Sequence, residues 1–108
     1  MTEARIVSDE PPGTVRRITV TGEIDLANAA DVERTVFSLT TNQLTRLVLD
    51  LGGLRYIDSA GLRVLFVLAT RLEISQIVLE LVVPDGCAVR RAVELAGMEA
   101  MVPIRAEG

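Results

Sequence analysis

The sequence has no histidine, no lysine and no tryptophan, and a single cysteine, Cys87. Without histidine, neither a Ser-His-Asp triad nor a Cys-His pair can form, and general base catalysis by imidazole is excluded. One cysteine without histidine provides no ligand set for structural zinc, an iron–sulfur cluster or c-type haem. It also excludes a disulfide within the chain. We therefore expect no metal, no cofactor and no conventional catalytic centre.

Aromatic residues and basic charge are also scarce. Aromatic residues make up 3% of the 108 residues, and 11 basic residues stand against 15 acidic ones, which gives a net charge of −4. Nucleic acids favour basic patches and stacking rings, so we expect no nucleic-acid partner. No stretch reaches the roughly 18 apolar residues of a membrane span, so we expect no membrane insertion. Residues 1–5 lack the basic region and apolar run of a secretion signal, which predicts a cytoplasmic protein.

Hydrophobic residues, by contrast, make up 49% of the sequence, which is enough to form a core. The length predicts one domain over residues 1–108. Apolar and polar residues alternate from Val15 to Thr21, and the turn signal Pro11-Pro12-Gly13 precedes them, which predicts a hairpin with a short first strand. Asn28 followed by Asp31 predicts a capped helix start. The expected segments are strands at 5–7, 15–21, 44–51 and 76–83, helices at 28–40, 59–73 and 88–96 (the last closed by Gly97), and an edge strand or tail contact at 101–104. The order β-β-α-β-α-β-α-(β) predicts an α/β fold with a mixed sheet, in which parallel crossovers follow the opening hairpin.

The segment with the most functional information is the loop that starts at Gly52 and leads to Asp58 and Ser59. Ser59 lies at a predicted helix start, where free N–H groups and partial positive charge accommodate an anion such as a phosphate. Ser59 could instead cap its own helix. A nucleophilic role would require an activating base, and Asp25 or Asp58 could act as one only with a raised pKa. Gly61 allows another group to approach the first helical turn closely.

Three blocks of the sequence resemble one known family. The run from Val48 to Leu62, V-L-D-L-G-G-L-R-Y-I-D-S-A-G-L, resembles the signature of the anti-sigma-factor antagonists, which are bacterial STAS domains. The earlier run at 22–25, Gly-Glu-Ile-Asp, resembles the Gly-Glu-(Leu/Ile)-Asp loop of the family, and residues 89–98 resemble its third helix and the turn that follows. The blocks occur in the order of the family and cover about residues 15–104. The resemblance implies a single STAS-like domain.

This resemblance implies a protein-binding switch and not an enzyme. In the family, the unmodified antagonist binds an anti-sigma factor that is also a serine kinase, and this binding frees the sigma factor. The kinase inactivates the antagonist by phosphorylating the signature serine, here Ser59, and a metal-dependent serine phosphatase reverses the modification. The partner-binding residues expected in this chain are Asp25, Asp58, Ser59, Ala60, Gly61, Leu62 and Arg63.

The chain departs from the family pattern at three places. Ala60 stands where many relatives carry a second hydroxyl residue, which leaves Ser59 as the single candidate acceptor. Arg63 adds a positive charge that can bind a phosphate or steer an acidic partner. The connection Glu73-Ile74-Ser75-Gln76 lacks the glycine often found there, so its turn geometry is left open.

Other readings of these residues stay open at the level of sequence. The chain could be a constitutive STAS scaffold subunit of a transporter or stress-sensing complex, in which Ser59 merely caps its helix. The apolar residues Leu62, Val64, Phe66 and Leu68 could form core or a partner surface. Cys87 is expected as a small buried or helix-start residue, with a redox role as the alternative.

Overall fold

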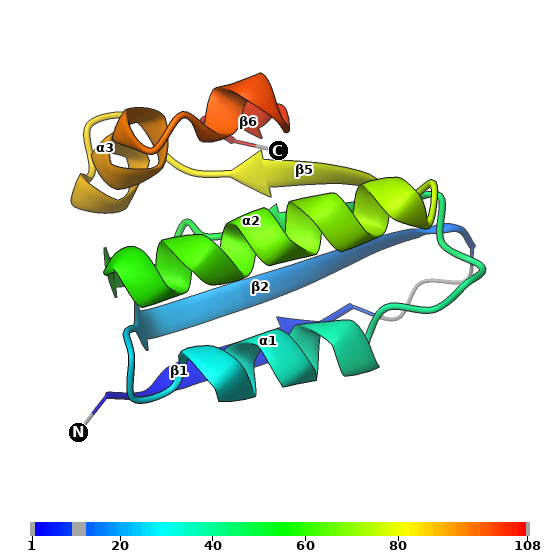
Figure 1. Cartoon of the computed structure of the whole chain (residues 1–108), viewed down its shortest axis with the longest axis horizontal. Helices are drawn as coiled ribbons and strands as arrows, with labels where there is room; N and C mark the ends of the chain where they lie inside the picture. Colours follow the sequence, from blue (N-terminus) through cyan, green and yellow to red (C-terminus); the bar gives the residue numbers. More distant parts are fainter. Residues whose placement is uncertain (1, 10–12, 108) are drawn as a thin grey trace.

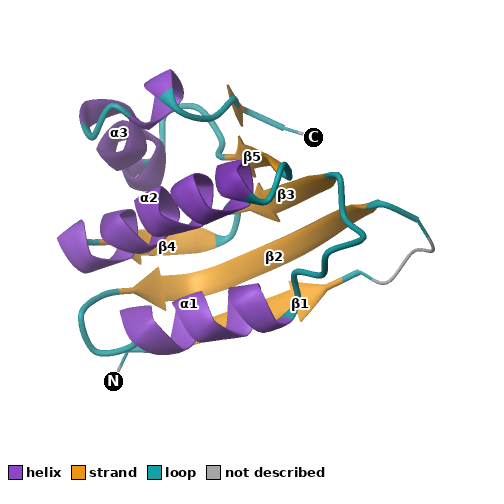
Figure 2. Cartoon of the chain, turned by 45° about the vertical axis from the view of Figure 1, so that its right-hand side comes forward, coloured by secondary structure: helices purple, strands orange, loops and turns teal. Residues whose placement is uncertain are grey.

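Strand β2 (Val15–Ile24) is the central element of the fold. The computed structural model describes residues 2–9 and 13–107 (Figure 1), and β2 pairs there with β1, β3 and β4 (Figure 2). The elements follow in the order β1 (Ala4–Ser8), β2, α1 (Ala29–Ser38), β3 (Arg46–Asp50), β4 (Leu54–Ile57), α2 (Ser59–Ile74), β5 (Val78–Val82), α3 (Ala88–Leu95), the 3-10 helix η1 (Met98–Ala100) and β6 (Ile104–Arg105).

The sheet combines an antiparallel hairpin with parallel crossovers, which confirms the predicted fold class. Its strand order is β1-β2-β3-β5-β6, with β4 also paired to β2. β1 is antiparallel to β2, whereas all the other pairings are parallel. Because β2 is 10 residues long, its first half pairs with β3 and its second half with β4. The turn residues 10–12 of the predicted hairpin lie outside the described residues.

Strand β4 is the one strand that the predicted order lacks. Residues 54–57, expected within a loop, form a strand because β2 extends past the end of β3 and leaves an edge there that needs a hydrogen-bonded partner. Gly53 allows this second strand to come close to β2, since a Cβ at Gly53 would lie 2.7 Å from Cγ2 of Thr21. The expected loop is thus a short turn at Gly52-Gly53 followed by a strand that leads directly to α2.

Helices α1 and α2 lie side by side on one face of the sheet (Figures 1 and 2). Val36 of α1 and Leu65 and Leu68 of α2 are almost completely buried against the strands. Val64 is also a core residue, whereas Leu62 and Phe66 are partly buried and pack against the core. The apolar surface of α2 therefore belongs mainly to the core. None of the helices in the described residues is long and apolar enough to cross a membrane.

The last helix agrees with the prediction for 88–96, whereas the edge strand expected at 101–104 is Ile104–Arg105, and the 3-10 helix η1 before it was not predicted. Gly97 has a φ of 78° directly after the end of α3, the left-handed conformation of a helix-ending glycine. Cys87 is the N-cap of α3, and its Sγ accepts from the N–H of Arg90 (3.3 Å). This confirms the expected helix-start position of Cys87. Ile104 and Arg105 form the outer strand β6 beside β5.

Candidate functional site

Ser59 is the first residue of α2, and its side chain is exposed. The N-cap of this helix is Asp58, whose Oδ1 accepts from the N–H of Gly61 (3.1 Å). The alternative in which Ser59 caps the helix is therefore wrong, because Asp58 already fills that position. Within the described part of the chain, the Ser59 hydroxyl has no hydrogen-bond partner. Ser59 thus presents a free hydroxyl at the positive end of a helix.

Asp58 also joins the helix start to the loop between β2 and α1. Its Oδ2 accepts from the N–H of Leu26 (3.2 Å), and its own N–H donates to the carbonyl oxygen of Ile24 (3.2 Å). The Gly-Glu-Ile-Asp segment at 22–25, which is the end of β2 and the first loop residue, thus lies next to the Asp-Ser start of α2, although the two are far apart in the sequence. The starts of α1 and α2 lie at the same end of the molecule (Figure 1).

The side chain of Asp25 accepts hydrogen bonds that stabilise its ionised carboxylate. The hydroxyl of Thr2 donates to its Oδ2 (2.5 Å), and the N–H of Ala27 donates to its Oδ1 (2.8 Å). These bonds, first among them the one from Thr2, hold the pKa of Asp25 below its ordinary value. A general base for Ser59 would need a raised pKa, so Asp25 is unsuited to that role.

Asn28 stands at the N-cap position of α1 but does not cap the helix with its side chain. Its Oδ1 accepts from the N–H of Asp25 (3.0 Å), and its Nδ2 donates to the carbonyl oxygen of Glu23 (2.9 Å). The predicted capping role is therefore wrong. The side chain turns back because the loop before the helix has backbone groups that need partners. Asn28 thereby fixes the shape of the loop that carries Asp25 and Leu26.

Gly61 is buried and faces the sheet. A Cβ at this position would lie 2.5 Å from Cγ1 of Ile57 and 3.0 Å from Cγ2 of Ile24. Gly61 therefore allows a close approach to the first turn of α2, as expected, but the groups that approach are core side chains of this chain. Among the other predicted partner-binding residues, Arg63 is exposed, and the partly buried ones are Asp25, Asp58, Ala60 and Leu62.

Ser59 lies at a groove of about 780 Å³ between α1 and α2. The α2 side of the groove contributes Ser59, Ala60, Arg63, Val64, Val67 and Arg71, and the other side contributes Leu26, Ala29, Ala30 and Glu33. The wall of the groove that α1 and its preceding loop form was not predicted from the sequence. Leu26 was the available signal, because it is an apolar residue in a polar loop and is 83% exposed.

The charged side chains of the groove lie on opposite walls. Arg63 and Arg71 line the α2 side and Glu33 the α1 side. The Arg71 guanidinium stacks over the ring of Phe37, 4.9 Å from its centroid. Arg63 forms no ion pair with any residue that the structure describes. The described residues also contain no cluster of three side chains suited to hold a metal ion.

These features define a small α/β domain that presents an exposed serine hydroxyl beside a groove. The model of the STAS domain family matches residues 6–107, and the chain therefore belongs to the STAS domain family. This confirms the resemblance seen in the sequence. The members of this family that are anti-sigma factor antagonists are regulatory binding proteins and not enzymes.

The chain is similar in sequence to two bacterial antagonists. It is 35% identical over 82 residues to the anti-sigma-F factor antagonist RsfB of Mycobacterium tuberculosis, covering 76% of this chain and 66% of the relative, just under two thirds of its length. It is 37% identical over 84 residues to the putative anti-sigma factor antagonist BtrV of Bordetella bronchiseptica, covering 77% of this chain and 71% of the relative.

Solved structures share the fold. An anti-sigma factor antagonist from Mycobacterium paratuberculosis superposes with a TM-score of 0.82 at 23% identity, covering 95% of this chain and 86% of that one. The antagonist SpoIIAA in its unphosphorylated form superposes with a TM-score of 0.73 at 16% identity, covering 93% and 87% of the two chains. At these identities the likeness establishes the fold.

Proposed function

We propose that this chain is an anti-sigma-factor antagonist whose binding is switched off by phosphorylation of Ser59. In this proposal the unmodified chain binds an anti-sigma factor that is a serine kinase, and so frees a sigma factor to bind RNA polymerase. The kinase then phosphorylates Ser59, and a serine phosphatase restores the active form. The names of the two sequence relatives support the first step of this proposal.

The observation that carries the proposal is the free hydroxyl of Ser59. A serine that caps its helix has its oxygen engaged with backbone N–H groups, but here Asp58 takes that role. Ser59 is exposed and lines the groove, so a kinase can reach its oxygen. The chain also offers it no histidine or lysine as an activating base. Ser59 is therefore suited to receive a phosphate and not to perform catalysis.

Charge explains how the phosphate would act as a switch. A phosphoserine carries about −1.5 to −2 charges, which would take the net charge of the chain from −4 to about −6 at one point of its surface. Asp58 is adjacent and Asp25 lies in the neighbouring loop. A partner that places an acidic or apolar group against Ser59 would meet repulsion and a desolvation cost. Binding would be lost without a change of fold.

The groove supports a protein partner in particular. Leu26 projects into solvent, and Val67 and Ala30 provide further apolar surface beside it. Arg63, which has no ion pair among the described residues, is available to an acidic group of the partner. An apolar contact flanked by single charges is typical of a protein interface.

The test is phosphorylation by the cognate anti-sigma kinase with ATP, followed by intact-mass spectrometry. Wild type should gain one phosphate, and Ser59→Ala should gain none. Ser75→Ala is the matched control, because Ser75 is an exposed serine at the other end of α2, and this variant should be phosphorylated like wild type. Stoichiometric phosphorylation of Ser59→Ala would contradict the site assignment.

A binding measurement tests the direction of the switch. Ser59→Ala should bind the kinase at least as tightly as wild type, whereas Ser59→Glu and the phosphorylated protein should bind weakly. A pull-down that recovers a transporter or stress-complex subunit and no kinase would favour the constitutive scaffold. Equal binding by the phosphorylated and unmodified forms would also overturn the switch.

A further inference from the structure

The outer edge of β1 is a second candidate interaction surface, separate from the Ser59 groove. β1 is the terminal strand of the sheet, and it pairs only with β2 in the part that the structure describes. The N–H of Asp9 donates to the carbonyl of Arg17 (3.0 Å), and the carbonyl of Glu3 accepts from the N–H of Glu23 (2.9 Å). Backbone groups in an antiparallel pair alternate in direction, so the odd-numbered residues of this segment face β2.

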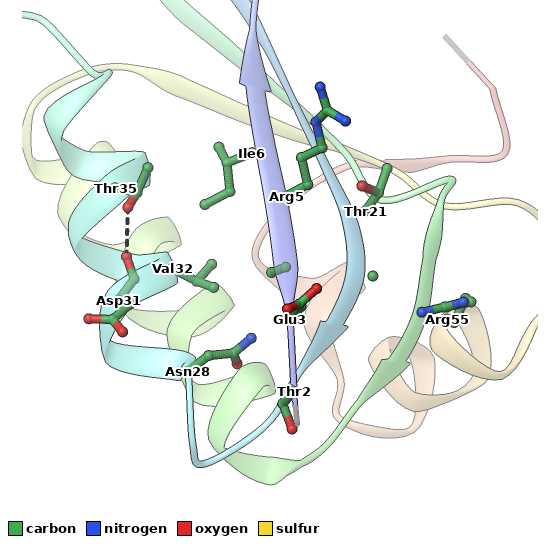
Figure 3. A pocket seen from close by; sticks show the side chains of 12 residues that line it. Thr2, Glu3, Arg5, Ile6, Thr21, Asn28, Asp31, Val32, Thr35 and Arg55 are labelled. Carbon is green, nitrogen blue, oxygen red and sulfur yellow. Dashed lines mark hydrogen bonds between the residues drawn. The ribbon is translucent and has the colours of Figure 1, made fainter.

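The backbone groups of Ala4, Ile6 and Ser8 consequently point away from the sheet. Such an edge is a template for one more strand. Along it lies a hollow of about 530 Å³ that α1 lines on one side of β1, and Arg5, Thr21 and Arg55 line on the other. Figure 3 shows Ile6 and Val32 on the α1 side of β1, and Arg5 on the opposite side. The side chains of an added strand would alternate between the α1 side of β1 and the side that carries Arg5.

We propose that the added strand is β1 of a second copy of this chain, antiparallel and centred on Ala4. Ala4 would then hydrogen-bond Ala4 of the other copy, and Thr2 would face Ile6. Glu3 of each copy would lie directly opposite Arg5 of the other. The two Glu3–Arg5 positions are non-hydrogen-bonded pairs of the ladder, in which side chains approach most closely. Two ion pairs between the copies would therefore form.

Charge selects this register over its alternatives. The outward backbone groups of the two copies meet only when even-numbered residues lie opposite even-numbered residues. The two-fold axis between the strands can then pass through Ala4, Arg5, Ile6 or Val7. With the axis at Arg5, the two Arg5 guanidinium groups would lie opposite each other. With the axis at Ile6, Glu3 of one copy would lie opposite Asp9 of the other. Both arrangements place like charges together. A centre at Val7 would pair Arg5 with Asp9, whose Oδ1 already accepts a backbone N–H (2.8 Å). The side chains of Glu3 and Arg5 form no ion pair with a described residue.

The start of β1 is already held in place for such pairing. Thr2 is hydrogen-bonded to Asp25 (2.5 Å), and the carbonyl of Glu3 accepts from the N–H of Glu23. The backbone there lies so close to Gly22 that a Cβ on that glycine would be 2.3 Å from the Glu3 oxygen. Little conformational entropy would therefore be lost at this segment when two copies pair. Ala4 at the symmetry axis also offers no bulk against close approach.

The test is sedimentation equilibrium of the full chain from micromolar to millimolar concentration. Wild type should form dimers. Glu3→Arg and Arg5→Glu should each weaken self-association by about tenfold or more, because both opposed pairs become like-charged. An equimolar mixture of the two variants should restore a heterodimer, since its opposed pairs are again arginine against glutamate. Asp9→Asn, which changes an exposed carboxylate of the same edge, is the control and should dimerise like wild type.

Amide hydrogen exchange checks the register. The N–H groups of Ala4 and Ile6 should become protected as the concentration rises, and that of Ser8 should not. Circular dichroism of each variant checks that the exposed substitutions leave the fold intact. A wild-type chain that stays monomeric to millimolar concentration overturns the proposal, as does a Glu3→Arg variant that dimerises like wild type.

Discussion

Asp58 and Asp25 are neighbouring carboxylates with different roles, because each meets different donors. Asp58 accepts from Gly61 and Leu26, so it fixes the helix start against the preceding loop. Asp25 accepts from Thr2 and Ala27, so it ties the same loop to the beginning of β1. Neither carboxylate bonds Ser59, whose hydroxyl has no hydrogen-bond partner among the residues that the structure describes.

The bond between Thr2 and Asp25 predicts a pH-dependent contribution to stability. Thr2→Val should raise the pKa of Asp25 toward its ordinary value of 3.8, because the hydroxyl is the main group that lowers it. A pKa that is lower in the folded chain contributes stability above the ordinary value, and this stability is lost as the pH falls through the folded-state pKa. The variant should therefore be less stable than wild type at neutral pH and equally stable in strong acid.

NMR titration of the Asp25 carboxyl carbon measures this shift, and denaturant unfolding at neutral and strongly acidic pH measures its effect on stability. Thr35→Val is the control, because the hydroxyl of Thr35 bonds only the carbonyl of Asp31 within α1 (2.8 Å). An unchanged pKa of Asp25 in Thr2→Val would show that the hydroxyl does not stabilise the carboxylate.

At the scale of an element, the end of α2 shows how the connection at 73–76 turns without the glycine that is often found there. The N–H of Ile77 donates to the carbonyl of Leu72 (2.8 Å), and the N–H of Gln76 donates to that of Glu73 (3.0 Å). This pattern is a Schellman motif, which requires a left-handed residue after the helix. Gln76 takes that conformation with a φ of 62°, although a side chain disfavours it.

Gln76→Gly should therefore stabilise the protein. Glycine adopts a positive φ without steric cost, and this gain exceeds its larger loss of backbone entropy, so we expect the free energy of unfolding to rise by about 0.5–1 kcal/mol. Gln76→Ala is the matched control, because alanine keeps the Cβ and should bring no such gain. Urea unfolding of the three proteins measures the difference, and a destabilised glycine variant would contradict the prediction.

At the scale of the whole molecule, Glu80 joins three strands on the sheet face opposite α1 and α2. It is 6% exposed, the only charged residue buried in the described part of the chain. Its Oε1 lies 2.9 Å from Nη1 of Arg46 on β3 and 3.6 Å from Nη2 of Arg105 on β6. The two-residue strand β6 depends on this contact, since it has few other bonds to the sheet.

Glu80→Gln should reduce the free energy of unfolding by about 1–2 kcal/mol, because charge-assisted bonds are lost while both arginines can still reach solvent. Hydrogen exchange at residues 104–105 should also become faster. Glu99→Gln, an exposed substitution on η1, is the control and should leave both measurements unchanged. Unaltered exchange at β6 in Glu80→Gln would show that the ion pairs do not anchor the C-terminal strand.

The helices could be predicted from the sequence to within two residues or so at each end, because their apolar spacing is a local property. β4 could not, since its four residues show no alternation and are exposed in the middle, at Arg55 and Tyr56. The capping role of Asn28 was likewise mispredicted. Its sequence fits a cap, but its actual partners, Glu23 and Asp25, are groups that only the folded loop brings to it.

The sequence by itself determined the α/β class, the absence of a histidine base, and the serine at a helix start, because these follow from composition and local spacing. Only the tertiary structure decided that Asp58 caps the helix, so that the Ser59 hydroxyl stays free. It also placed Leu26 and α1 beside that serine, and it left the outer edge of β1 without a partner strand in the part of the chain that the structure describes. Such features depend on which distant backbone groups meet, and hydrogen bonding and close packing settle this only when the whole sheet forms.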